Sequence, residues 1–151
     1  MTKPLTAKQF WHFSGELYGK PGVKEICLNL QDQFDLNVNL VLLLCWCEQH
    51  QRVLSAVQVE ALVAGIAQWH QDYTRPMRVL RRRLARDDAT DSEAKQAMLD
   101  AELALERVEQ RLLLAVFNGF EVVVEDSFCL AGYVSDEGVL RGLRAVMWAR
   151  H

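Results

Sequence analysis

The sequence predicts an all-α fold, namely a single-domain bundle of about six to seven helices that contains a long antiparallel helical hairpin. Apolar residues recur three and four positions apart through most of the 151 residues, which is the spacing of amphipathic helices. Patterns typical of helix N-termini precede several of these stretches. Only 120–124 is rich in residues that favour a strand, and no second strand is available to pair with it.

The first half of the chain predicts two short helices. Thr6 and Gln9 form a capping-box pattern, so a first helix begins there and ends before Gly19. Pro21 fits the first position of a second helix, because its missing N–H needs no partner there.

A third helix follows, running to about His50, with Asp35 or Asn37 as its N-terminal cap. It is apolar nearly all round over 38–47, which is typical of a central helix buried on most sides. Asn39 is the exception in this stretch, and a buried amide must find hydrogen-bond partners.

A fourth helix begins at a second capping box, formed by Ser55 and Gln58. Gly65 allows close packing against a neighbouring helix. We expect this helix to end near Thr74, because Pro76 disfavours helical backbone in the residue before it.

The following two helices form the predicted hairpin. The fifth, at 76–87, turns Met77, Leu80 and Leu84 to one face. Thr90 with Glu93 caps the sixth, which is long. An apolar seam runs along the sixth helix through Ala94, Met98, Ala101, Leu105, Val108, Leu112 and Ala115.

A second apolar face of the sixth helix carries Leu99, Leu103 and Leu114, and it predicts a homodimer through these residues. Beyond it, 119–134 is predicted to be irregular or partly helical, and Ser135 with Gly138 opens a last helix. We divide the single domain 1–151 into an N-terminal part (1–74), the charged hairpin (75–118) and a C-terminal part (119–151).

Several features indicate a cytoplasmic protein. The N-terminal residues lack the apolar core of a secretory signal, and 38–47 is too short for a membrane helix. The four cysteines, Cys27, Cys45, Cys47 and Cys129, lack the spacing of disulfide, redox or zinc motifs. We therefore expect buried, reduced thiols and no membrane contact.

Charge is segregated along the chain. Six arginines and no acid lie within 75–86, whereas 87–109 has eight acidic residues against two basic ones. Four of the arginines, Arg75, Arg78, Arg82 and Arg86, share one helix face. They are predicted to contact another macromolecule together with Trp11 on the first helix. The alternative is neutralisation by Glu102, Glu106 and Glu109 across the hairpin, and the sequence leaves the choice open.

A polar set lies next to the buried third helix and includes Asn29, Gln31, Asp32 and Asn39. It predicts either a small polar pocket or a hydrogen-bond network that fixes the turn between the second and third helices.

No catalytic, cofactor or metal motif is present. The four histidines are scattered, and the sequence contains neither a Gly-rich phosphate loop nor a nucleophile-elbow motif. We therefore expect no enzyme activity, no cofactor and no metal. The favoured hypothesis is a helical interaction module, an adaptor or regulator of a protein partner. The alternatives are association with nucleic acid or the ribosome through the same arginines, and a small-ligand binder at the polar pocket.

The N-terminal third resembles the opening signature of a family of small proteobacterial proteins described as a domain of unknown function. The residues that carry the resemblance are Phe10, Trp11, Phe13, Ser14, Tyr18, Gly22, Val23, Cys27, Leu28, Leu30, Gln31, Asp32, Val38, Asn39, Leu40 and Trp46. The Arg-rich segment after Trp69 also resembles the middle of that family. Asp35 and Asn37 depart from its pattern, which often has Gly and Asp there. The resemblance implies a helical bacterial cytosolic protein and supplies no catalytic residue.

Overall fold

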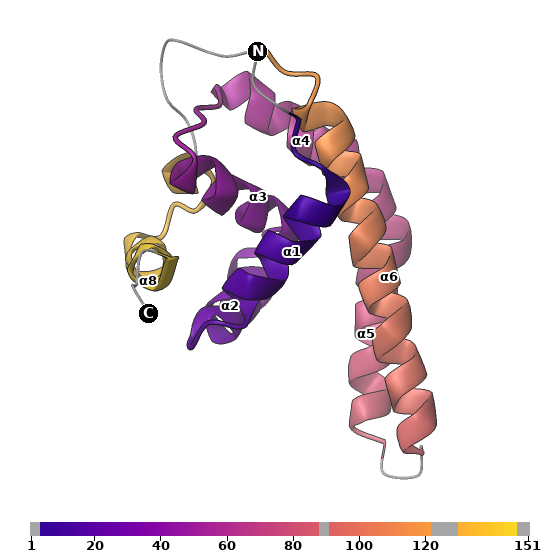
Figure 1. The fold of residues 1–151 in the computed structure, drawn as a ribbon. Coiled ribbons are helices and arrows are strands. Elements are labelled where there is room, and N and C mark those ends of the chain that lie inside the picture. The colour runs from indigo at the N-terminus through magenta and orange to yellow at the C-terminus, as the bar shows by residue number, and fades with distance from the viewer. Residues whose placement is uncertain (1–3, 88–90, 122–129, 148–151) are drawn as a thin grey trace.

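The computed structural model describes residues 4–87, 91–121 and 130–147, and in them it contains helices and no β-strand. The predicted all-α fold is therefore confirmed (Figure 1). The elements in chain order are α1 (Ala7–Tyr18), α2 (Val23–Phe34), α3 (Val38–Gln49), α4 (Ala56–Trp69), the π-helical segment η1 (His70–Thr74), α5 (Arg75–Ala85), α6 (Ser92–Phe117), α7 (Leu130–Tyr133) and α8 (Glu137–Met147).

Three of the helix starts follow the local sequence. Both predicted capping boxes are present, with the Thr6 and Ser55 hydroxyls each accepting from a backbone N–H at 3.1 Å. Asn37, and not Asp35, caps α3, since its side chain accepts from the Leu40 N–H. Asp35 instead ends α2 in the left-handed conformation, with φ 52°.

Three other starts differ from the prediction. The α6 cap is Asp91, whose carboxylate accepts from the Ala94 N–H, and Thr90 lies outside the described residues. Asp136, and not Ser135, accepts from the Val139 N–H at the start of α8. Helix α2 begins after Gly22, which adopts φ 86°, so Pro21 remains in the preceding turn. In each case the helix begins one or two residues later than predicted. Asp91 and Asp136 each accept from an N–H three residues ahead, whereas at Gly22 the positive φ is a conformation that glycine adopts without strain.

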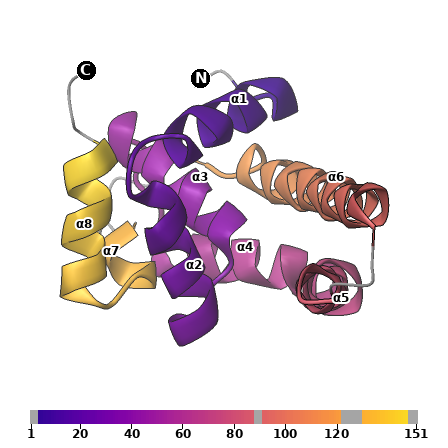
Figure 2. The same cartoon turned by 90° about the horizontal axis from the view of Figure 1, so that it is seen from below.

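Helix α3 is the centre of the core, as its all-round apolar sequence predicts. Six consecutive residues from Leu40 to Cys45 are buried, and Cys47 is buried as well. Helices α1, α2, α6 and α7 all contact α3 (Figure 2). Burying apolar surface on every side of one helix is the main stabilising contribution in such a bundle.

Helices α5 and α6 form the predicted antiparallel hairpin, which projects from the rest of the molecule (Figure 1). The C-terminal half of α6 packs on α4, where a Cβ added to Gly65 would meet Val116 Cγ2 at 3.0 Å. The absence of a side chain at Gly65 therefore allows the close approach that the sequence predicted.

The fourth helix does not end at Thr74, and this expectation was wrong. Helix α4 continues through η1 into α5. Pro76 has no N–H and its ring clashes with a carbonyl one turn earlier. The wider turn of a π-helix accommodates both effects, so the helix continues from α4 through η1 into α5.

The C-terminal part adds two helices. Helix α8 packs on α2, with Leu143 buried and Arg144 paired to Glu48 at 2.6 Å. Cys27, Cys45 and Cys47 are buried, whereas Cys129 lies outside the described residues. Within the part of the chain that is described, no helix has the length and apolarity needed to cross a membrane.

Candidate functional site

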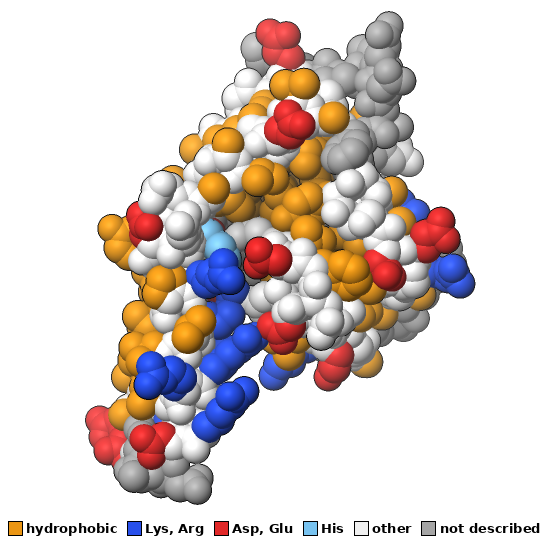
Figure 3. All heavy atoms as spheres, turned by 180° about the vertical axis from the view of Figure 1, so that it is seen from behind, with side chains coloured by type: hydrophobic (Ala, Val, Ile, Leu, Met, Phe, Trp, Pro, Cys, Tyr) orange, Lys and Arg blue, Asp and Glu red, His pale blue; other side chains and the backbone are white. Residues whose placement is uncertain are grey.

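A cleft of about 770 Å³ separates the α5–α6 hairpin from α1 and α2. The first two turns of α3 contribute Asn37, Val38, Asn39 and Leu42 to its lining. Figure 3 shows Lys and Arg side chains gathered along the inner side of the projecting hairpin, facing the body of the molecule. The cleft therefore combines residues that are far apart in the sequence.

A buried carboxylate, Glu109, lies at the inner end of the cleft and is only 1% exposed. Its Oε2 accepts from Asn39 Nδ2 at 2.8 Å and from Asn37 Nδ2 at 3.5 Å, and its Oε1 is 2.6 Å from His70 Nδ1. Burial by itself would raise the pKa of Glu109, but the hydrogen bonds from His70 and Asn39 outweigh burial and lower this pKa. Glu109 is thus a buried anion that joins α6 to α3 and to η1.

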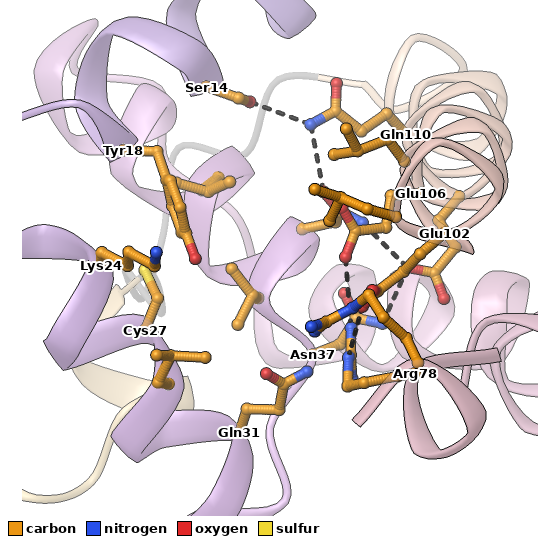
Figure 4. Close-up of a pocket in the computed structure, with 18 of the residues that line it drawn as sticks. Ser14, Tyr18, Lys24, Cys27, Gln31, Asn37, Arg78, Glu102, Glu106 and Gln110 are labelled. Carbon is orange, nitrogen blue, oxygen red and sulfur yellow. Dashed lines mark hydrogen bonds and ion pairs between the residues drawn. The ribbon is translucent and has the colours of Figure 1, made fainter. Parts of the chain in front are cut away.

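A second buried amide extends this network towards α1. Gln110 Nε2 donates to Ser14 Oγ at 3.0 Å and to Asn39 Oδ1 at 3.1 Å (Figure 4). Asn39 therefore donates to one α6 residue and accepts from the next. The partners that a buried Asn39 requires are present. They lie on α6, so this network joins α3 to α6 and differs from the predicted one, which would fix the turn between the second and third helices.

The inner arginines of α5 are neutralised by α6. Arg78 donates to Glu102 Oε1 at 3.2 Å and to Glu106 Oε1 at 3.3 Å, and Arg81 also pairs with Glu102. The Arg78 side chain is only 12% exposed. With its amide oxygen turned to the guanidinium, Gln31 on α2 accepts from Arg78 as well. Of the four stripe arginines, Glu102 and Glu106 therefore pair with Arg78 alone, so the predicted neutralisation across the hairpin holds for one member of the stripe.

The negative charge of Glu106 is not fully stabilised by its surroundings. Burial and the nearby Glu102 carboxylate raise its pKa, while Arg78 acts in the opposite direction. Glu109, the third acid proposed to face the arginines, pairs with His70 instead.

The outer arginines differ from the inner ones. Arg82 donates across the cleft to Asp32 Oδ1 at 3.0 Å, and these two side chains are 37% and 46% exposed. Arg86 and Lys24 also line the cleft, and neither has an ion pair with another described residue. Arg75 is exposed and does not line the cleft, so the predicted stripe is divided between the cleft and the outer surface.

The orientation of α5 corrects one expectation. Met77 and Leu84 are half-buried as expected, but Leu80 is 44% exposed and Val79 is exposed as well. The arginine face points inward because α6 places carboxylates there, and an ion pair with a hydrogen-bonded partner satisfies a guanidinium near the interface.

Most of the other predicted site residues line the cleft, and one of them does not. Trp11 is half-buried, lines the cleft, and lies 4.5 Å below the Arg107 guanidinium. Gln31, Asp32 and Asn39 line the cleft, but Asn29 is exposed and does not. The expectation for Asn29 was wrong because two residues turn a helix by about 200°, so Asn29 points away from the side that carries Gln31.

The second apolar face of α6 also has a different explanation. Leu99 and Leu103 are exposed residues that line the cleft, so this face borders the cleft. Leu114 is 4% exposed and belongs to the core of the single chain, which makes it unsuitable as a dimer contact. The homodimer itself remains a prediction.

The sequence did not indicate His70, Gln110 or Lys24 as site residues, and Tyr18 stood out only as part of the family signature. The one indication of this network in the sequence was Asn39, because a buried amide needs hydrogen-bond partners, but the sequence does not show which residues they are. The contact between His70 and Glu109 depends on the π-helical phase of η1, which no local pattern indicates. Among the described residues, no group of three His, Cys, Asp or Glu side chains could hold a metal ion.

The fold and the cleft define an all-helical protein with a groove of mixed charge. The chain belongs to the family described as "Protein of unknown function (DUF2390)", whose model matches residues 9–113. This confirms the resemblance to a family of unknown function, and every residue that lines the cleft lies within the matched range. Comparisons with curated proteins and with solved structures found no match.

Proposed function

We propose that the protein is a non-enzymatic interaction module that holds a segment of a partner protein in the cleft. One observation carries the proposal: Trp11 of α1 and three of the four stripe arginines, Arg78, Arg82 and Arg86, line the same groove. We place this activity in the cytoplasm, and we propose no chemical step for it.

The shape of the cleft supports a chain segment as its occupant. Lining residues on α6 extend from Leu99 to Gln110, which corresponds to about 16 Å along the helix axis. That length accommodates about five residues of extended chain or three turns of helix. Both are recurring modes of peptide recognition in grooves.

The polar inner end argues against a small polar ligand. Asn39, Glu109 and Gln110 donate to or accept from one another, from His70 and from Ser14. Most of their hydrogen-bonding capacity is already used within the protein, and among the described residues only Gln110 Oε1 of these three side chains is a buried atom without a partner. A ligand at this end would have to replace these bonds, whereas a segment lying along the outer cleft would leave them intact.

The charges argue for a protein and against a nucleic acid. Five basic and four acidic side chains line the cleft, and the acidic ones are Asp32, Glu102, Glu106 and Glu109. Phosphate groups at every step of a nucleic-acid strand would meet these carboxylates, and like charges repel. A protein segment can place a charge only where a complementary side chain lies.

A selection from a random peptide display library tests the proposal. Selected peptides should shift the NMR signals of the Trp11 indole and the Leu103 methyl groups and leave those of Val57, which is exposed on α4, unchanged. Leu103→Glu should abolish binding, and Val57→Glu is its matched control. Failure to select peptides, or shifts outside the cleft, would refute the proposal. A gel shift with RNA that weakens steeply with salt would favour the nucleic-acid alternative instead.

A further inference from the structure

The arginines of α5 are neutralised to different degrees along the cleft. Arg78 has two carboxylate partners and the Gln31 amide, and Arg81 shares one of those carboxylates. Arg82 has a single partner, Asp32, which belongs to another helix. Arg86 is exposed and has no ion pair with any described residue. Among these arginines, the charge that is available to an occupant therefore lies at the outer end, on Arg82 and Arg86.

The pair between Arg82 and Asp32 is suited to exchange. It consists of one nitrogen–oxygen contact of 3.0 Å, and both side chains are more than one-third exposed. Exposed pairs of this kind contribute little to stability, because both charges are well solvated when apart. A carboxylate brought by an occupant can take the place of Asp32 without cost to the buried network at the other end of the cleft.

The spacing of the two arginines restricts the occupant. Arg82 and Arg86 are four residues apart, so their attachment points are separated by about 6 Å along α5. Two carboxylates match this distance when they are three or four residues apart on a helix, or two residues apart in an extended segment. Leu99 and Leu103, also four residues apart, provide exposed apolar contacts from α6 on the same cleft.

We infer, building on the proposed function, that the occupant is an acidic amphipathic segment of a partner protein. Its two carboxylates pair with Arg82 and Arg86, the first by displacing Asp32, and its apolar side chains contact Leu99 and Leu103. Asp32 thus competes with the partner's carboxylate for Arg82, and it pairs with Arg82 until the partner binds.

The peptides selected on the cleft test this inference through their sequences and affinities. They should be enriched in pairs of acidic residues at the spacings given above. With the double variant Arg82→Gln/Arg86→Gln, fluorescence anisotropy should show affinity about tenfold weaker, as expected when charge-assisted pairs are lost. Arg83→Gln is the matched control, since Arg83 is exposed on the same helix and does not line the cleft.

The competitor role of Asp32 has its own measurement. Asp32→Asn should tighten peptide binding by about threefold, because an exposed pair that competes for Arg82 is removed. Glu25→Gln, an exposed acid of α2 outside the cleft, should leave the affinity unchanged.

Three outcomes overturn the inference alone, and a fourth overturns it together with the proposed function. Cleft-binding peptides without acidic pairs do so while the proposed function stands. The inference is also wrong if acidic peptides bind the Arg82→Gln/Arg86→Gln variant as tightly as the wild type. It is equally wrong if the Asp32→Asn variant binds peptides no more tightly than the wild type. If no peptide binds the cleft, the proposed function and this inference fail together.

Discussion

The carboxylate of Glu109 is predicted to be the most sensitive polar group of this fold. Glu109→Gln preserves the shape of the side chain but replaces one acceptor oxygen with an NH₂ group. In the wild type, Oε1 faces His70 Nδ1 at 2.6 Å and Oε2 faces Asn39 Nδ2 at 2.8 Å. If the new NH₂ faces Asn39 Nδ2, two donors meet and a buried donor is left without a partner. If it faces His70 Nδ1, that ring nitrogen must accept, and the contact of the wild type with a charged carboxylate is lost.

The magnitude follows from the bonds that are lost. A hydrogen bond to a charged group contributes about 1.5–3 kcal/mol, and an unsatisfied buried donor costs a similar amount. We expect Glu109→Gln to lower the free energy of unfolding by about 1.5–3 kcal/mol. For a chain of 151 residues, each kcal/mol corresponds to roughly 2–4 °C in Tm.

Urea denaturation followed by circular dichroism measures this change. Glu93→Gln is the matched control on the same helix, because Glu93 is exposed and has no ion pair with another described residue. This control should stay within about 1 kcal/mol of the wild type. If Glu109→Gln unfolds at the same urea concentration as the wild type, the assigned hydrogen-bond network is incorrect.

The effect also depends on pH in a defined direction. The folded state lowers the pKa of Glu109, so this group contributes stability that is fully present above the unfolded value of about 4.3. That contribution is lost as the pH falls through the lower, folded pKa. The difference in stability between the wild type and Glu109→Gln should therefore shrink in acid. A difference that is constant from neutral pH to pH 3 would contradict the direction of the shift.

Two further predictions concern the core. Burial raises the pKa of the Cys27 thiol to about 12, so in native protein at pH 8 it should react with iodoacetamide far more slowly than in urea; comparable rates would contradict its burial. Gly65→Val should destabilise the protein by about 1–3 kcal/mol, since its side chain meets Val116 across α4 and α6. Gly15→Val serves as the control in thermal melts, because a Cβ at Gly15 meets no atom within 4 Å, and equal losses at both glycines would refute the argument.

The sequence by itself determined the features that depend on one or two helical turns. The hydroxyls of Thr6 and Ser55 and the amide of Asn37 each reach an N–H three residues ahead, so these helix starts were predictable from local patterns. The position of α3 at the centre was equally predictable, because a helix that is apolar on all sides can only be stable when it is surrounded.

Only the tertiary structure decided which way the polar faces point. Helix α5 has an arginine face and an apolar face. Arg78 faces α6 because it pairs with carboxylates there, and Leu80 is exposed. His70 reaches Glu109, 39 residues away, because η1 changes the phase of the helix at that point. Such contacts depend on how whole helices are rotated and packed against one another. Because an unpaired buried charge is costly, the favoured packing is the one that pairs charges from different segments, and no single segment specifies it.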